Sequence, residues 1–347
     1  MTEMAETGSR SAAESVPPKP GMPARSRAAL ARSIAHPTTT MLLVLVGIVG
    51  IFSVLSPDAF STSDNARNLA ADAAILLVLS VGATFVIVTA GIDLSVGSVL
   101  VFSAVVGAKA MERVGGEGMG TMLVGLVAAL AGGAAWGLLN GTLVAKLKVP
   151  PFVVTLGTFG AAYGLALIIV NGVDVRSVPI RLVDFGNGRV FGIPELALVA
   201  LVVTIVFGIV LAKTRFGRYT YAVGSNAESA RRAGINVDRQ LIWVYTLAGL
   251  LAGLGGFLSL ARFGTTTVAG HTTDNLQVIT AVVIGGTSLF GGAGGMLGTA
   301  VGVFIPIVLA NGFIVLGFVP FWQYVAVGAV LVLAVYLDQR RRARRLG

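Results

Sequence analysis

The longest segments without a charged residue constrain this chain more than any other feature. No Asp, Glu, Lys or Arg occurs between residues 275 and 337 or between 118 and 145. One membrane crossing needs about 20 predominantly apolar residues, so each of these segments is long enough to span a bilayer. Only 12% of all residues are charged, about half of what a soluble domain carries. The sequence therefore predicts an all-α integral membrane protein.

Further charge-free runs give the positions of the helices. After a first apolar run over 41–55, which we interpret as an anchor helix, single helices are expected over 73–92, 94–108, 118–145, 149–173, 196–212 and 241–261. The last run, 275–337, holds either three crossings with tight turns at 290–292 and 311–312, or one crossing and a re-entrant pair. We expect a polytopic bundle of about ten transmembrane helices. Glycine-rich breaks after residues 90 and 284 suggest two weakly related halves.

Basic residues set the expected orientation. Most of the 25 lysines and arginines fall in 1–36, in the turn around 146–148, in the loop 213–239 and at the C-terminus. Cytoplasmic segments of membrane proteins carry this excess, so both termini are expected in the cytoplasm. The predicted parts are a disordered cytoplasmic tail (1–36), a transmembrane domain (37–339) that contains the cytoplasmic loop 213–239, and a basic cytoplasmic tail (340–347). The net charge of +9 thus reflects topology rather than nucleic-acid binding.

The sequence lacks the residues that several kinds of catalysis and cofactor binding require. The chain has no cysteine, no phosphate-binding Gly-Lys-Ser/Thr loop and only two histidines. His36 lies in the tail, and His271 is interpreted as a solvated residue of the outer segment 264–273. We therefore expect no enzyme activity, no metal and no cofactor, and no ATP bound by this chain. Asp93 is the only charged residue at a plausible membrane depth, so the energy for any transport should come from another subunit.

Asp93 lies in an unusual stretch, Gly-Ile-Asp-Leu-Ser-Val-Gly-Ser from Gly91 to Ser98. Its distinctive positions are Gly91, Asp93, Ser95, Gly97 and Ser98. Asp93 either serves as the N-cap of a helix that starts at Leu94, with Gly91 allowing a tight entry, or faces a polar path through the membrane.

The remaining polar groups of the apolar runs are neutral hydroxyls and amides. Such groups can exchange hydrogen bonds with an uncharged polyol, although each alone could equally join two helices. The candidate translocation path consists of Thr89, Thr155, Thr158, Asn275, Thr287, Ser288 and Asn311.

The loop 213–239 contains the signals of a short helix. Ser225 and Glu228 have the spacing of a capping box, and Gly234 supplies a stop. A helix over about 226–233 is expected on the cytoplasmic side, with Arg231 and Arg232 near its C-terminal end. It is either a simple connector or a coupling helix that contacts a cytoplasmic partner, through Ser225, Asn226, Ala227, Glu228, Ala230, Arg231, Arg232 and Gly234.

Four stretches in the expected order resemble one family. Gly91 to Ser98 is similar to the signature of the ribose-type sugar permeases, the membrane subunits of bacterial ATP-driven (ABC) importers, and 150–158, 222–228 and 283–292 resemble that family too. Glu228-Ser229-Ala230, followed by Gly234, resembles the Glu-Ala-Ala…Gly motif of importer membrane subunits and departs from it at Ser229. That motif docks in a cleft of the ATPase, so Ala227, Ala230 and Ala233 are expected to let the helix seat closely.

The resemblance implies a permease subunit for a monosaccharide, ribose-like, in the bacterial plasma membrane. Its implied partners are an ABC ATPase, an extracytoplasmic sugar-binding protein and a second permease subunit, with a homodimer expected. The alternative is a self-contained secondary carrier or channel for a neutral polar solute. The scarcity of buried charge argues against a carrier driven by protons or ions.

Overall fold

The structure is a computed structural model that describes residues 37–271, 273–319 and 321–346, and most of these residues are helical. Within the same residues one two-stranded antiparallel hairpin pairs Arg189 with Pro194. The elements in chain order are α2 Pro37–Leu55, α3 Pro57–Phe60, α4 Ser63–Val88, α5 Val96–Val114, α6 Met119–Ala145, α7 Pro151–Val170, α8 Ile180–Asn187, β1 Arg189–Val190, β2 Ile193–Pro194, α9 Glu195–Lys213, α10 Arg215–Ser225, α11 Ala227–Arg232, α12 Val237–Phe263, α13 Asp274–Ile284, α14 Met296–Val315 and α15 Trp322–Leu346.

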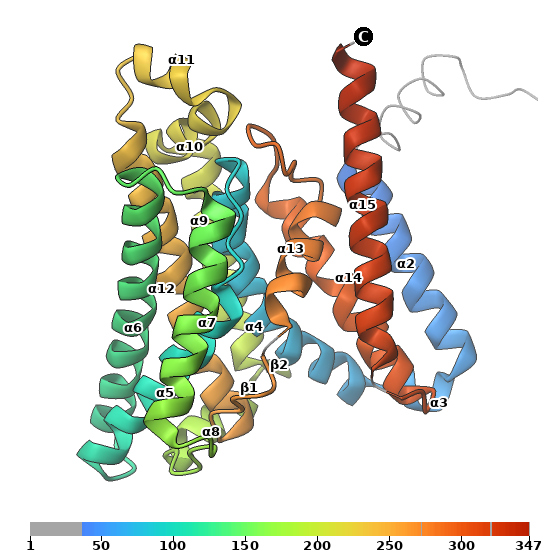
Figure 1. The fold of residues 1–347 in the computed structure, drawn as a ribbon. Coiled ribbons are helices and arrows are strands. Elements are labelled where there is room, and N and C mark those ends of the chain that lie inside the picture. The colour runs from blue at the N-terminus through green and yellow to red at the C-terminus, as the bar shows by residue number, and fades with distance from the viewer. Residues whose placement is uncertain (1–36, 272, 320, 347) are drawn as a thin grey trace, which may run out of the picture.

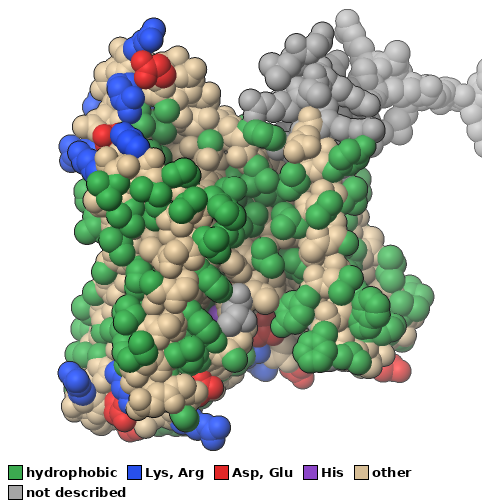
Figure 2. All heavy atoms as spheres, in the orientation of Figure 1, with side chains coloured by type: hydrophobic (Ala, Val, Ile, Leu, Met, Phe, Trp, Pro, Cys, Tyr) green, Lys and Arg blue, Asp and Glu red, His purple; other side chains and the backbone are tan. Residues whose placement is uncertain are grey.

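Six helices within the described residues are long and apolar enough to cross a membrane: α4, α6, α7, α9, α12 and α14. On the face shown in Figure 2, apolar side chains form a broad band across the middle of the molecule, while Lys, Arg, Asp and Glu lie mainly toward its two ends. The all-α membrane fold is thus confirmed, and the total of about ten crossings stays a prediction.

The helices stand in two groups with α4 and α13 between them (Figure 1). One group holds α5, α6, α7, α9 and α12, and the other holds α2, α14 and α15. The short helices α10 and α11 protrude at one end of the bundle, where α15 also ends, and α3 and α8 lie at the opposite end. We call these the α11 end and the α8 end.

The core is built around α4 and α12. Of the most apolar stretch of α4, 94% is buried inside the chain, so this helix faces protein rather than lipid. A side-chain carbon at Gly249 would collide with the backbone of Gly133 and Gly137 on α6, and one at Gly253 would collide with that of Ala129. Small residues let these two helices approach closely, as they do in many membrane bundles.

The apolar run 275–337 is divided differently from the first alternative given above. The turn around 290–292 is confirmed, but the turn at 311–312 is wrong, because Asn311 and Gly312 lie inside α14, which ends at Val315. The ring of Phe52 packs against Gly312 and leaves no room there for a side chain. Helix α13 has only 11 residues, so at 1.5 Å per residue it covers about half of a ~30 Å hydrocarbon core. The chain nevertheless runs from Arg262, which bonds to Asn187 at the α8 end, to Gly292, which bonds to Val88 at the α11 end. It therefore joins the two ends of the bundle through a half-length helix, which favours three crossings over a re-entrant pair.

The expected division into a tail, a transmembrane domain and a basic tail stays a prediction. The predicted tail 1–36 lies outside the described residues. The backbone of α15 continues as a helix through the basic segment to Leu346, so no break separates that segment from the transmembrane domain.

Candidate functional site

The stretch Gly91–Ser98, which we call the Gly91–Ser98 loop, comprises most of the connection between α4 and α5 and the first three residues of α5, in the interior of the bundle. Helix α5 begins at Val96 with Ser95 as its N-cap, so the expectation that Asp93 caps a helix starting at Leu94 is wrong. Asp93 Oδ1 instead accepts hydrogen bonds from Ser95 N at 2.8 Å and Ser95 Oγ at 2.6 Å. A carboxylate that binds the backbone two residues later forms an Asx turn, which here lies just before the first turn of α5.

Three other helices hold this loop in place. Asn140 of α6 donates from Nδ2 to Ser95 Oγ at 2.9 Å. Thr155 of α7 donates to the carbonyl oxygen of Ile92 at 3.2 Å, and Asn275 of α13 donates from Nδ2 to that of Leu94 at 3.2 Å. Buried backbone carbonyls need such partners, so α6, α7 and α13 together determine the shape of the loop.

The loop is buried and polar but holds no ion pair. Asp93 is only 7% exposed, and no Lys, Arg or His forms a salt bridge with it among the described residues. Beside the loop lie two buried oxygens without a hydrogen-bond partner, Asn140 Oδ1 and the Tyr245 hydroxyl. A side-chain carbon at Gly91 would meet that hydroxyl. Spare acceptors and donors with little charge suit a neutral polar solute rather than an ion.

His271 lies in a different environment from the one expected. It is buried, with 7% of its surface exposed, so its interpretation as a solvated loop residue is wrong. Its ring lies 2.7 Å from Ser259 Oγ and 2.7 Å from Asp274 Oδ2. A side-chain carbon at Gly97 would meet the His271 carbonyl oxygen. The segment before α13 therefore folds back into the bundle, beside the start of α5.

The proposed path residues do not form one continuous group. Thr155 and Asn275 contact the Gly91–Ser98 loop directly, and Thr158 donates to the carbonyl of Thr155 at 3.3 Å. Thr89 bonds to Val86 O at the end of α4. Asn311 lies apart from them, in reciprocal amide hydrogen bonds with Asn65 at 2.8 and 3.0 Å.

The remaining two path residues, Thr287 and Ser288, belong to the loop 285–295, which meets the end of α4 and the end of α10. Gly292 N donates to Val88 O at 2.9 Å, and a side-chain carbon at Gly224 would collide with that same carbonyl. The Tyr221 hydroxyl of α10 donates to Gly294 O at 2.9 Å. Burial raises the pKa of the Tyr221 phenol, so it remains a donor at neutral pH. We call this contact of three backbones, at Val88, Gly224 and Gly292, the glycine junction.

The short helix expected in the loop 213–239 is present as α11, Ala227–Arg232, but its cap differs. Ser225 is the last residue of α10, and Asn226 is the N-cap, with Oδ1 accepting from Ser229 N at 2.8 Å. The capping-box assignment of Ser225 is therefore wrong, because a preceding helix extends through it. Gly234 stops the helix as expected, with φ of +82°. Sequence reasoning did not anticipate α10.

The three alanines of α11 and its C-cap face different ways. Ala227 and Ala233 are exposed, whereas Ala230 is 5% exposed and packs with Val223 and Val237. Ala230 therefore seats α11 on its own chain rather than on a partner. Glu228, Arg231 and Arg232 are exposed and form ion pairs at 3.5 and 3.2 Å within the helix.

Some residues of this site carried weak signals in the sequence. The three-residue spacing of His271 and Asp274 at a helix start could have indicated their contact. Tyr245 is a lone hydroxyl-bearing aromatic in a glycine-rich apolar helix, yet nothing in its surroundings in the sequence places it beside Gly91. No group of three or more His, Asp or Glu that could hold a metal occurs in the part of the chain that the structure describes.

Comparisons with known proteins agree that the chain is similar to transport permeases, although the names that they carry differ in cargo. A family model described as "Branched-chain amino acid transport system / permease component" matches residues 65–335. The chain is 39% identical to the ribose import permease protein RbsC of Escherichia coli K12 over 87% of this chain and 93% of that protein. It is 36% identical to the fructose import permease protein FrcC of Rhizobium meliloti, over 88% and 86%, and 33% identical to the D-allose permease AlsC of Escherichia coli K12, over 85% and 90%. No solved structure matches significantly.

Proposed function

Because the chain belongs to the family of permease components described for branched-chain amino acid transport systems, we propose that it is the translocation subunit of a bacterial ABC importer for a monosaccharide, ribose-like in kind. The observation that carries this proposal is the identity of 39% with a ribose import permease over nearly the full length of both chains. The chain is also 36% and 33% identical to fructose and D-allose permeases, so the proposed cargo class is broader than ribose alone.

The Gly91–Ser98 loop supports a neutral cargo. Around Asp93 the described side chains offer hydroxyls and amides, some with unused hydrogen-bonding capacity. A sugar passing such groups exchanges hydrogen bonds without meeting a strong charge, so it can both enter and leave. We propose that the signature residues and Thr155, Thr158 and Asn275 line or shape the path, with Thr89, Thr287 and Ser288 at its α11 end. Asn311 is the least supported member because it bonds to Asn65.

The energy source is proposed to be a separate ATPase. The α11 end carries the basic residues of α10 and α11 (Figure 2), as expected of a cytoplasmic face. In this orientation α11 is the coupling helix, both termini are cytoplasmic, and the domain 37–339 crosses the membrane about ten times. A sugar-binding protein would deliver cargo at the α8 end, and a second copy of this chain would complete the permease.

The glycine junction offers a route from α11 to the path. Helix α11 follows α10 directly, and α10 contacts both Val88 at the end of α4 and Gly292 of the loop 285–295. Backbones this close cannot move independently. A push on α11 would therefore reach the α11 end of the polar interior, at Thr89 and Thr287.

The central experiment is uptake in vesicles that contain this chain with its ATPase and sugar-binding protein. We expect accumulation of labelled ribose, or of another monosaccharide that binds the sugar-binding protein, only when ATP is present. Uptake by this chain alone would instead support the carrier or channel. ATP-dependent uptake of a branched-chain amino acid but of no sugar would refute the cargo class.

A test of the coupling assignment needs a substitution at an exposed position of α11. Ala230 is unsuitable for this test because it is buried. Ala227→Trp places a bulky side chain on the exposed face of α11, and Ala59→Trp places the same side chain on exposed α3 at the opposite end. We expect Ala227→Trp to fold, to lose co-purification with the ATPase and to stop uptake, while Ala59→Trp retains co-purification with the ATPase. Normal assembly and uptake of Ala227→Trp would reduce α11 to a connector.

A further inference from the structure

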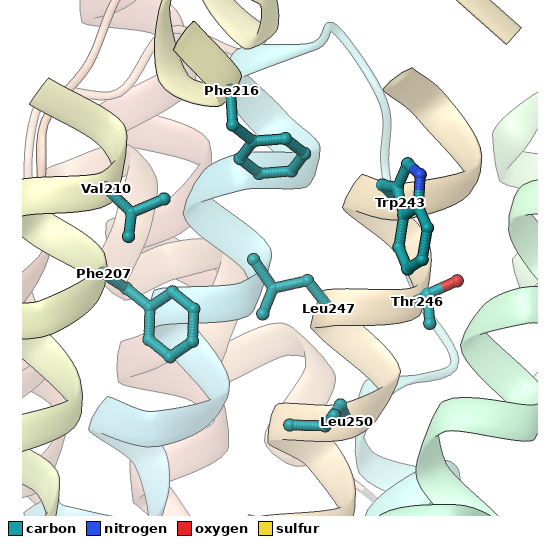
Figure 3. A pocket seen from close by; sticks show the side chains of 7 residues that line it. All are labelled: Phe207, Val210, Phe216, Trp243, Thr246, Leu247 and Leu250. Atoms are coloured by element: carbon teal, nitrogen blue, oxygen red, sulfur yellow. The ribbon is translucent and has the colours of Figure 1, made fainter. Parts of the chain in front are cut away.

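An apolar groove of about 420 Å³ runs along the outside of the bundle between α9 and α12, beneath α10. Figure 3 shows its seven lining side chains, with Phe216 of α10 at one end and Leu250 of α12 at the other. The lining is almost free of polar atoms, because the only hydroxyl, that of Thr246, bonds to Ile242 O of its own helix at 2.8 Å. The lining residues are Phe207, Val210, Phe216, Trp243, Thr246, Leu247 and Leu250.

Two walls of the groove are fixed by the core. Phe207 and Phe216 both contact the ring of Phe85 on α4, with centroids 6.3 and 5.8 Å apart. Gln240 of α12 donates to Phe216 O at 3.1 Å, which ties the third wall to the same point. The groove is therefore preformed, and a site of this volume and lining is typical of a ligand pocket.

Positive charge borders the groove at one end only. Arg239 lies one helical turn before Trp243 and so on the same face of α12, and Arg215 directly precedes Phe216. Both arginines are exposed, and neither forms an ion pair within the described residues. The neighbouring acid, Asp238, is engaged by Lys148 and Arg231 at 2.7 and 3.6 Å. An unpaired cationic rim above an apolar slot is complementary to a phospholipid, whose headgroup is negatively charged and whose acyl chains are apolar.

We propose that this groove is a binding site for an acidic phospholipid of the leaflet at the α11 end. One acyl chain lies along Phe207, Leu247 and Leu250, and the phosphate lies between Arg215 and Arg239. Trp243 is 53% exposed and sits between them, at the level where tryptophan prefers the boundary of headgroups and acyl chains. The bound lipid would pack against Phe216 of α10, so it would stabilise the helix that leads into α11.

The test uses the full chain in lipid nanodiscs with Trp136→Phe and Trp322→Phe, which leave Trp243 as the only tryptophan. Bromine on acyl chains quenches nearby indole fluorescence. We expect brominated phosphatidylglycerol to quench Trp243 at a lower mole fraction than brominated phosphatidylcholine. Arg239→Gln should reduce this preference about five-fold, the effect of one cation near an anionic surface. Adding Arg215→Gln should remove most of the rest, and high salt should weaken it too.

Lys146→Gln is the matched control, since Lys146 is an exposed cation at the same end outside the groove, and it should leave the preference unchanged. Equal quenching by the two lipids would overturn the headgroup assignment. Absence of quenching by either lipid would show that protein, such as a second copy of this chain, covers the groove. None of these results depends on sugar transport, so the proposal can fail while the proposed function stands.

Discussion

The Gly91–Ser98 loop and the segment Asn226–Gly234 use the same local chemistry in opposite surroundings. In the first, Asp93 accepts a hydrogen bond from the backbone two residues later, and in the second Asn226 accepts one three residues later. Asp93 is buried among four helices, whereas Asn226 and most of α11 are exposed. A short polar side chain therefore shapes the backbone in both places, but only in the interior do its neighbours make the residue hard to replace.

The largest effect is expected at Asp93. Asp93→Leu leaves the buried Ser95 N–H and hydroxyl without their acceptor, at about 1–3 kcal/mol for each group. We expect a loss of about 3 kcal/mol in the free energy of unfolding, measured by thermal unfolding of the purified chain. Asp93→Asn keeps an acceptor oxygen and should lose less than about 1 kcal/mol. Equal losses would contradict this account, and a stable Asp93→Asn without uptake would reveal a role for the charge.

A smaller effect is expected at the glycine junction. Gly224→Val forces a branched side chain against Val88 O and Gly292 N, and such overpacking costs about 1–3 kcal/mol. Gly157→Val in α7 is the control, because the space around Gly157 is open. We expect a lower unfolding temperature and slower uptake for Gly224→Val only. Equal behaviour of both variants would show that the junction is not tightly packed.

A substitution at Gly234 tests the exposed segment of the comparison, Asn226–Gly234. Its φ of +82° disfavours any side chain, although nothing surrounds it. Gly234→Ala should therefore cost about 1 kcal/mol, confined to α11. Hydrogen exchange should accelerate at amides 230–235 and nowhere in α12, and Gly234→Asn should recover part of the protection. Faster exchange across the core would indicate that α11 stabilises the bundle.

The smallest effect is expected at Glu228. Its ion pairs with Arg231 and Arg232 are exposed, and such pairs contribute about 0.5 kcal/mol or less. Glu228→Gln should leave the unfolding temperature unchanged within error, at low and at high salt. A clear destabilisation would mean that α11 is more enclosed than its exposure indicates.

The parts of the fold that were predicted correctly depend on local features of the sequence. The run 118–145 gave α6 nearly to the residue, and Gly234 gave the end of α11, because each depends on a few consecutive residues. The start of α5 and the cap of α11 were misplaced by one or two residues. Asp93 and Ser225 satisfy the composition of a cap, but Asp93 bonds within its own turn and Ser225 belongs to α10.

The site was predictable only as a set of residue types. Asp93 and its glycines were identifiable as a polar break between apolar runs, but their contacts come from residues 45 to 181 positions away. Asn311 had the same amide as Asn275 and was predicted for the same path, yet it bonds to Asn65. Residue type does not reveal which of two equivalent amides faces the loop.

By itself the sequence determined that this chain is an all-α membrane protein with a polar break at Gly91–Ser98 and a capped helix before Gly234. These follow from hydropathy and hydrogen-bonding capacity, which each residue carries wherever it lies. The tertiary structure alone decided that His271 is buried against Ser259, that Ala230 faces its own chain and that Gly224 meets Val88 and Gly292. In an apolar bundle many helix pairings bury similar surfaces, and the choice among them depends on how backbones and side chains fit across the whole chain.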